Sequence, residues 1–345
     1  MKAVLAISGV TFLALVATAA FARDWDDFTP RDPVVKQAGH YEWNWDGDDA
    51  LSLEAPATMH YTPGGSPRIV ITGPEDLLAR IRVGQGHIRF DRDFDRDWDH
   101  VDNDRLQVTV TGVTVHNISV SGSGRATLEK LNLDHLDLAI SGSGSLAGDG
   151  RSDRLHVAVS GSGRADVTKL AANEADINIS GSGTVADAGR SDHLGLNISG
   201  SGHGELGQLQ VRDAKIRLSG NGTVAIGRGL EQLDLTLSGG AHVDLGTLQA
   251  RETRIQMSGS GQVNGSGSSD RVMLSMSGHG TADLGQLQTR EADIRVFGNG
   301  RVTLSPRETA NVTVSGSGVV AMATRPAHLS QHTSGAGSVR IGDDR

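Results

Sequence analysis

The chain has 345 residues, including 46 Gly and no Cys, and its 41 Asp and Glu outnumber its 32 Lys and Arg, which gives a net charge of −9. Without Cys there are no disulfides, no thiolate metal sites, no Cys nucleophile and no lipoprotein acylation site. The acidic balance argues against a nucleic-acid-binding protein, which needs a basic surface. The length is compatible with two domains or with one elongated repeat fold.

Residues 1–22 have the features of a secretory signal peptide. Lys2 precedes an apolar run that ends in Ala20-Phe21-Ala22, an A-x-A cleavage site. An uncleaved membrane anchor is the alternative, but the small residues at the cleavage positions favour removal. No later segment is apolar enough to span a bilayer. We therefore expect a mature chain in the periplasm or the medium, without a transmembrane segment.

Residues 23–45 are expected to form a leader and an N-terminal cap. Tyr41, Trp43 and Trp45 alternate along a strand-like run and so share one face. We interpret these aromatic side chains as closing the open end of an apolar core. The alternative is an aromatic platform for a ligand.

An acidic insert at residues 91–104 holds alternating Asp residues. Calcium takes six to eight oxygen ligands, so the calcium candidates are the carboxylates of Asp91, Asp93, Asp95, Asp97 and Asp99. Arg92 and Arg96 lie between them, and no Gly or bidentate Glu completes a defined calcium loop. We favour a solvated loop, and calcium binding is the alternative. No other cofactor is expected.

Residues 106–345 contain a regular repeat. Ser-Gly-X-Gly or a close variant recurs with a longer and a shorter interval in alternation, so that the full unit consists of two intervals. The motifs begin at Ser121, Ser141, Ser160, Ser180, Ser199, Ser219, Ser238, Ser258, Ser277, Ser315 and Ser334, and Phe297 takes the one missing place.

Two columns of apolar residues precede these motifs with the alternation of a half-buried strand. Column 1, directly before the motif, is Val120, Ile140, Val159, Ile179, Ile198, Leu218, Leu237, Met257, Met276, Val296 and Val314. Column 2, two residues earlier, is Ile118, Leu138, Val157, Ile177, Leu196, Ile216, Leu235, Ile255, Leu274, Ile294 and Val312. Further inward residues follow the motif, among them Leu131, Leu170, Leu209, Leu248 and Leu287, which recur once per full unit.

Five residues before each motif, large and small side chains alternate. The series is Leu155, Ala175, Leu194, Ala214, Leu233, Thr253, Val272 and Ala292, with the small residue always in the longer interval. We infer that the longer interval carries its extra residue at a corner and inserts its own Leu there. Adjacent coils then interlock, large over small, as close packing requires.

The repeat predicts an all-β fold, a right-handed parallel β-helix (solenoid) with about 19–20 residues per turn over residues 46–345. One strand–turn–strand unit cannot bury its apolar side alone, but stacked coils can. Coils spaced by about 4.8 Å would form a rod of roughly 50 Å. A left-handed hexapeptide helix would need a six-residue beat, which the motif spacing does not have. Calcium-binding nonapeptide repeats would need an Asp one residue earlier than Asp166.

The chain resembles the GIN-domain family of auto-transporter adhesin heads (domain of unknown function 2807). The resemblance covers most of residues 46–345. It is carried by the recurring I/V-S-G-S-G motif and by opening segments at residues 57–61, 68–73, 77–78, 81–83 and 86–90. It implies a right-handed parallel β-helix in an exported bacterial protein, and it brings no catalytic residues. This chain departs from the family in its additional turns and in the acidic insert.

Charged residues also recur with the repeat. Glu174, Asp213, Glu252 and Glu291 form one series, with Arg212, Arg251 and Arg290 before three of them, and Asp153, Asp192, Glu231 and Asp270 form another. A catalytic pair would be singular, so we interpret both series as solvated corner charges that pair across coils. His203 and His242 are equivalent residues two coils apart, and His279 lies near them in register. A shared metal is not expected for these three.

The sequence predicts a structural or adhesive module of the surface or envelope rather than an enzyme. Its working surface would be a flank formed by the Ser–Gly corners and the charge series, and its partner an unidentified cell-surface or polysaccharide ligand. The alternative is a polysaccharide-binding or polysaccharide-cleaving β-helix that uses Asp166, Asp244 and Asp283. After Trp98 the only aromatic residue is Phe297, so no aromatic sugar platform is expected there. Self-association of rods is a further hypothesis.

Overall fold

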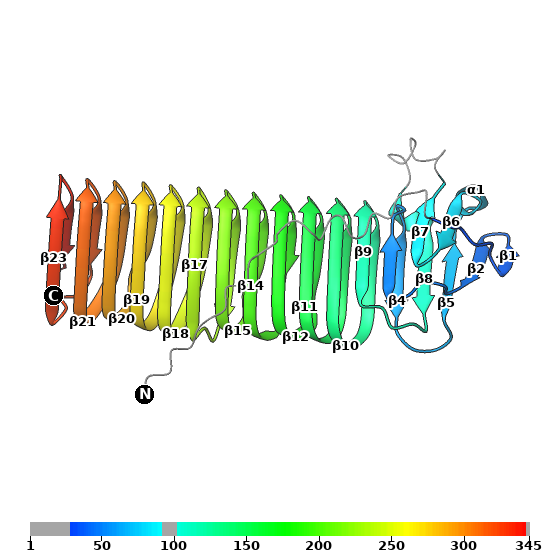
Figure 1. Cartoon of the computed structure of the whole chain (residues 1–345), viewed down its shortest axis with the longest axis horizontal. Coiled ribbons are helices and arrows are strands. Elements are labelled where there is room, and N and C mark those ends of the chain that lie inside the picture. The colour runs from blue at the N-terminus through cyan, green and yellow to red at the C-terminus, as the bar shows by residue number, and fades with distance from the viewer. Residues whose placement is uncertain (1–27, 92–101, 343–345) are drawn as a thin grey trace, which may run out of the picture.

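The computed structural model describes residues 28–91 and 102–342. About 74% of the chain is strand and 2% helix, and the strands wind into a parallel β-solenoid of about 11 turns (Figure 1). The predicted fold is therefore confirmed. The predicted signal peptide lies outside the described residues. In Figure 1 the N-terminal elements lie at one end of the rod and the C-terminal coils at the other. Residues 58–62 pair with both residues 107–111 and residues 125–128, so the chain doubles back once near its N-terminal end before it advances coil by coil.

The coils from β9 onward pair in parallel, each with the coil before and the coil after it. Most coils are one long strand that bends at a corner, and a Ser–Gly turn separates it from the next. The strands are β9 (Asn117–Gly122), β10 (Arg125–Gly142), β11 (Ser145–Gly161), β12 (Arg164–Gly181), β13 (Thr184–Ala186), β14 (Arg190–Gly200), β15 (His203–Gly220), β16 (Thr223–Arg228), β17 (Gln232–Gly239), β18 (His242–Gly259), β19 (Gln262–Gly278), β20 (Thr281–Gly298), β21 (Arg301–Gly316), β22 (Val319–Met322), β23 (His328–Ser334) and β24 (Ser338–Ile341).

The N-terminal elements close the first coil. They are β1 (Val35–Gln37), β2 (His40–Asn44), β3 (Ala50–Leu53), β4 (Thr58–Thr62), β5 (Arg68–Thr72), α1 (Glu75–Leu78), β6 (Ile81–Gly84), β7 (His87–Phe90), a 3₁₀ helix (Asn103–Arg105) and β8 (Gln107–Thr111). β3 and β4 continue the parallel stack by pairing with β9 and β10. β1, β2, β5 and β8 pair antiparallel, as do β6 and β7. Antiparallel pairing ends the winding, because such a strand cannot continue the coil.

Tyr41 and Trp43 lie in the core at this end. They are 3% and 2% exposed, and Trp45 is partly buried and packs against the core. The Trp43 Nε1–H donates to the Arg31 carbonyl at 3.0 Å, so the indole loses no hydrogen bond on burial. The aromatic rings therefore close the apolar end of the rod, and the alternative of an exposed platform is not what the structure shows for Tyr41 and Trp43.

The columns identified in the sequence form the interior. No residue of column 1 or column 2 is more than 5% exposed, and the Leu residues that recur once per full unit are equally buried. The pairing register places Leu155 against Ala175, Ala175 against Leu194, and Leu194 against Ala214. The predicted large-over-small packing is confirmed.

The first bend of the coil after the turn, at residues 128–131 in β10, explains why longer and shorter intervals alternate. Between Leu128 and Leu131 of β10 the register shifts against β11, where Gly148 and Gly150 are the partners. The extra residue is thus a bulge in the longer coil, and Lys130 adopts a φ of 56° there. Leu131 lies opposite Gly150 of the shorter coil, which is a second large-over-small contact that the sequence analysis did not identify.

The Ser–Gly turns stack with backbone hydrogen bonds. The Ser182 N–H donates to the Gly161 carbonyl at 2.8 Å, and the same contact recurs in neighbouring coils. Gly181 has a φ of 111°, and a Cβ on Gly183 would lie 2.4 Å from the Val159 side chain. The first Gly supplies a conformation that other residues avoid, and the second allows the turn to lie directly on the core.

Candidate functional site

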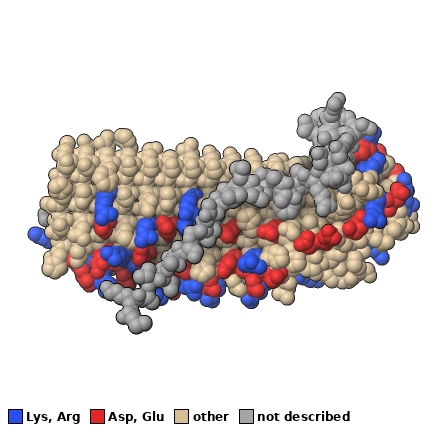
Figure 2. All heavy atoms as spheres, in the orientation of Figure 1, with Lys and Arg blue, Asp and Glu red and all other residues tan. Residues whose placement is uncertain are grey.

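The Ser–Gly turns and the charge series lie on opposite edges of the rod. A series residue such as Glu174 precedes Ser180 by six residues of extended strand, which is about 20 Å. Over the solenoid, Figure 2 shows uncharged side chains along the edge of the turns at the top and charged ones over the lower half. The expectation that both features form one flank is therefore wrong. The turns carry small polar side chains, whereas the corner carries the charges.

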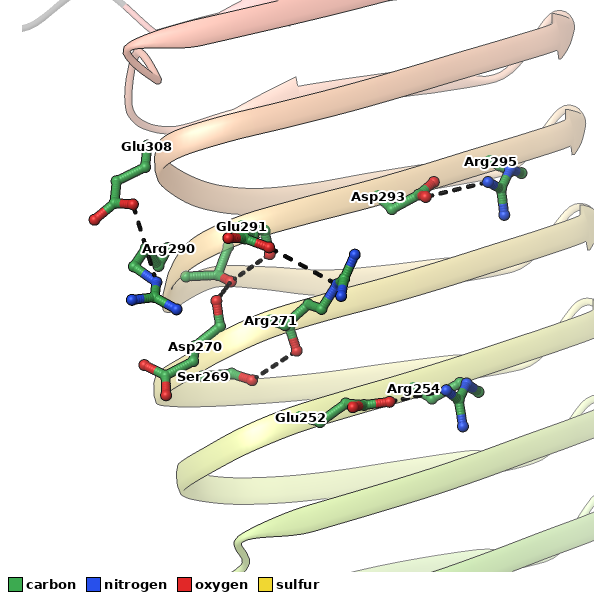
Figure 3. Close-up of polar contacts among 11 residues, drawn as sticks. Glu252, Arg254, Ser269, Asp270, Arg271, Arg290, Glu291, Asp293, Arg295 and Glu308 are labelled. Atoms are coloured by element: carbon green, nitrogen blue, oxygen red, sulfur yellow. Dashed lines mark hydrogen bonds and ion pairs between the residues drawn. The ribbon is translucent and has the colours of Figure 1, made fainter. Parts of the chain in front are cut away.

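Some of the corner charges pair between coils, as the sequence indicated. Arg251 contacts Glu231 at 2.6 Å, Arg271 contacts Glu291 at 3.8 Å, and Arg290 contacts Glu308 at 3.9 Å. Figure 3 shows the last two contacts, together with pairs inside one strand such as Arg254 with Glu252 at 2.8 Å. All of these side chains are well exposed, so each pair contributes at most about 1 kcal/mol. Because such pairs recur from coil to coil, we interpret them as a feature of the repeat.

A shallow open groove of about 630 Å³ interrupts the face formed by the strands that directly follow the Ser–Gly turns. Small residues form the floor of the groove. They are Ala186, Gly204 and Ala225, and their larger neighbours on adjacent coils rise around them. Charged and polar side chains border it: Arg164, Asp166, Asp187, His203, Glu205, Gln208, His242 and Asp244. The coils lose regularity here, since β13 ends at Ala186 and β16 ends at Arg228 without joining the next strand.

Two of the three acids proposed for an enzymatic function border this groove, but each has a local structural role. Asp166 Oδ1 accepts from the Thr168 hydroxyl at 2.7 Å, and this contact is the main cause of its lowered pKa. Asp244 and Asp283 accept from the backbone N–H two residues further on, at 2.9 and 3.4 Å. Asp166 and Asp244 are four coils apart, about 19 Å, which is beyond the roughly 5–10 Å between the carboxylates of a glycosidase pair.

Asp187 is a groove residue that was not identified from the sequence, as are Arg164 and Glu205. It is 3% exposed, and its Oδ1 accepts from the Gly189 N–H at 2.9 Å. Burial raises its pKa to about 6, against the opposing effect of the Gly189 and Ala188 N–H groups. The signal for it was present, because Asp187-Ala188-Gly189 replaces the apolar residues that follow the turn in regular coils.

The three histidines noted in the sequence do not converge. His203 and His242 border the groove two coils apart, about 10 Å, and His203 Nδ1 lies 2.6 Å from the Thr223 hydroxyl. His279 Nε2 lies 3.2 Å from the Asn299 amide at the turn edge. The distances agree with the expectation that these three do not share a metal.

Of the calcium candidates, only Asp91 belongs to the described residues. Asp91 Oδ2 lies 3.3 Å from Arg82 Nη2, so an arginine occupies one side of the carboxylate. Asp93, Asp95, Asp97 and Asp99 lie outside the described residues. Calcium binding therefore stays a prediction of the sequence.

The opening strands, the repeat and the turns agree with a known family model. The model DUF2807, described as "Putative auto-transporter adhesin, head GIN domain", matches residues 49–229 and 228–326. The chain belongs to this family. The resemblance inferred from the I/V-S-G-S-G motif is thus confirmed, and the GIN-domain match covers both the coil under the cap and nearly all the later coils.

Solved structures from three bacterial species share low identity with this GIN-domain chain. A putative lipid binding protein from Parabacteroides distasonis is 15% identical, covers 88% of this chain and 96% of its own, and has a TM-score of 0.30. A putative adhesin from Parabacteroides merdae is 15% identical with 88% and 95% coverage and a TM-score of 0.28. One from Bacteroides fragilis is 14% identical with 90% and 100% coverage and a TM-score of 0.24.

No curated protein matches the chain. Within residues 28–91 and 102–342, no helix has the length and apolar character needed to cross a membrane.

Proposed function

We propose that this chain is an exported, non-enzymatic β-solenoid that serves as a structural or adhesive module at the bacterial surface or envelope. The family match supports this proposal. The observation that carries it is the form of the molecule, a rod whose outward side chains repeat coil after coil at about 4.8 Å. Such a surface suits an extended or repetitive partner, because the same contact is offered many times.

The groove is the part of this surface where a partner would be held most specifically. It combines a hollow floor with side chains that donate and accept hydrogen bonds, and it is open along its length. Among the residues that the structure describes, no Phe, Trp or Tyr borders it. Recognition there would therefore depend on hydrogen bonds and charge instead of ring stacking.

A binding assay with a matched pair of variants tests the proposal. The labelled chain is offered to cell envelopes, host-surface preparations and polysaccharides, with an unrelated β-solenoid as reference. Ala225→Arg places a long side chain in the groove, and Ala147→Arg makes the same change in the same outward column outside it. We expect binding by the wild type and by Ala147→Arg, with at least a tenfold loss for Ala225→Arg. Binding no better than that of the reference solenoid would refute adhesion.

A second candidate function is the binding or cleavage of a polysaccharide in the same groove. It is favoured by Glu205, which lies between Asp166 and Asp244 and pairs with Arg164 at 2.8 Å. Incubation with uronate polymers, monitored by the absorbance of unsaturated products and by reducing ends, tests cleavage. Activity that is lost in Glu205→Gln would establish an enzyme, and no product with any polymer would remove the enzymatic alternative.

Export is tested separately. The A-x-A site predicts cleavage after Ala22. Mass spectrometry of the protein from periplasm and medium should therefore find a chain that begins at Arg23. A chain retained in the cytoplasm with residues 1–22 intact would contradict the proposed location.

A further inference from the structure

Two histidines and an aspartate meet at the first corner of the solenoid. His116 precedes β9, and its backbone N–H donates to the Asp49 carbonyl at 2.9 Å. Asp134 and His135 are adjacent in β10. Neighbouring residues of a regular strand point to opposite faces, but residues 132–135 form the corner and none of them is buried. The side chains of Asp134 and His135 can therefore lie on the same side of the chain.

The three side chains form one cluster around a carboxylate oxygen. Asp134 Oδ1 lies 3.0 Å from His135 Nδ1 and 3.4 Å from His116 Nε2. The imidazole rings stack at 4.2 Å between centroids with 8° between their planes. One potential ligand atom from each residue lies within 4.8 Å of the others. In the part of the chain that the structure describes, this is the one group of three or more His, Asp or Glu with that property.

The geometry points to a divalent transition-metal site, and we propose that His116, Asp134 and His135 bind Zn²⁺. Ligand atoms around a tetrahedral zinc lie about 3.4 Å apart, given metal–ligand distances of roughly 2.0–2.2 Å. The separations of Asp134 Oδ1 from the two imidazole nitrogens, 3.0 and 3.4 Å, are already close to that value. Rotation of the imidazole rings would direct a nitrogen of each ring toward one ion. Solvent would supply the fourth ligand, because the Asp134 side chain is 69% exposed.

The ligand types decide between metals. Calcium and magnesium take oxygen ligands, whereas imidazole nitrogen suits zinc, copper and nickel. Two nitrogens and one carboxylate oxygen therefore favour a transition metal at His116, Asp134 and His135 over the calcium that the all-oxygen acidic insert could take. The site would tie the segment before β9 to the corner of β10, so bound metal should stabilise the joint between the cap and the first full coil.

The chain contains a matched control. His193 Nδ1 lies 3.3 Å from Asp213 Oδ2, so it also pairs with a carboxylate of the next coil at a corner. Arg212, and not a second histidine, approaches His193 from the other side, at 3.3 Å. If a surface His–Asp pair were sufficient for zinc, His193 would bind it as well. If a second imidazole is required, only the cluster at His116 will.

Isothermal titration with Zn²⁺ on the tag-free, metal-stripped chain tests the site. We expect one ion per chain with micromolar affinity. His116→Gln and His135→Gln should each weaken binding at least tenfold, Asp134→Asn should weaken it less, and His193→Gln should leave it unchanged. Circular dichroism checks that each variant is folded. Ring ¹⁵N signals of the wild type provide a second readout, and those of His116 and His135 should shift on zinc addition.

Several outcomes would overturn the inference. They are the absence of one-to-one binding below about 100 µM, equal losses in His193→Gln and His116→Gln, and ring signals of His116 and His135 that do not respond to zinc. Substitution with Co²⁺ distinguishes a defined site from non-specific binding, because tetrahedral Co²⁺ gives an intense visible spectrum that the two Gln variants should lack.

Discussion

The first glycine of the Ser–Gly turns occupies a backbone conformation that other residues avoid. At Gly181 the φ of 111° is unfavourable for any residue with a Cβ, and an added Cβ would lie 2.7 Å from the Gly161 carbonyl oxygen. The neighbouring coil occupies that space, so the backbone cannot relax locally. The same conflict recurs at each turn because every coil lies directly on the one before it.

Gly181→Ala should therefore lower the free energy of unfolding by about 1–3 kcal/mol. Chemical denaturation followed by circular dichroism measures the change. Ser182→Ala is the control, since Ser182 is exposed in the same turn and should alter stability by less than about 0.5 kcal/mol. Equal effects of the two variants would show that the turn tolerates a Cβ at Gly181.

Asp187 should make stability depend on pH in an unusual sense. Its folded-state pKa of about 6 lies above the value of a free carboxyl, so between about pH 4 and pH 6 the native chain binds more protons than the unfolded one. The contribution is present at pH 4 and is lost as pH rises through 6. Asp187→Asn resembles the protonated form and removes this dependence.

Denaturation at several pH values tests this expectation. Relative to wild type, Asp187→Asn should gain stability as pH rises from 4 to 7, by at most about 3 kcal/mol for a shift of roughly two pKa units. Carboxylates with lowered pKa values, such as Asp166, titrate at lower pH in both proteins and cancel in the comparison. A constant difference across the range would contradict the raised pKa.

At the scale of the elements, alternation of large and small residues joins neighbouring coils. Ala214 of β15 lies in register with Leu194 of β14 and Leu233 of β17, and all three are buried. The short side chain leaves room for leucines from both sides. The longer coil supplies its own bulk at Leu209 instead.

Ala214→Leu should destabilise the protein by about 1–3 kcal/mol, because it places three leucines in line where only two fit. Thermal unfolding measures the change. Ala147→Leu is the matched control, since Ala147 faces outward from β11 and its enlargement meets solvent. A neutral Ala214→Leu would show that the coils can separate enough to accept uniform side chains.

The whole rod has two unequal ends. The N-terminal end is closed by antiparallel strands and by buried Tyr41 and Trp43. The last coil has no such cap among the described residues, and β23 is exposed at all but one position. In a stack of coils each unit contacts only its neighbours, so the ends can be removed independently.

Deletion of residues 328–345 should leave a folded, soluble rod with a slightly lower melting temperature, since no residue of β23 or β24 is fully buried. Deletion of residues 23–45 should expose the apolar end and the β5 edge and lead to aggregation. Size-exclusion chromatography and circular dichroism distinguish the outcomes. Equal solubility of both truncated chains would show that the aromatic cap is dispensable.

Much of the coil could be predicted because its signals are local and repeated. The residues of columns 1 and 2, such as Ile177 and Ile179, alternate with polar neighbours on a strand, and this alternation alone defines their inward face. The candidate site was harder to predict from the sequence. Asp166 and Asp244 were identified as acids near one strand, but the sequence did not reveal Asp187 or the small floor around Ala225 that creates the groove.

The parallel coil, its core columns, the interlocking of large and small residues and the family could all be predicted from the sequence alone. The tertiary structure decided where charges and turns lie, how the antiparallel cap closes the core, and that His116 meets His135. The two histidines are separated in the sequence by close to one coil, yet the period alone does not bring them together. Their meeting depends on a corner, where side chains no longer alternate and their directions follow from the coils stacked against them.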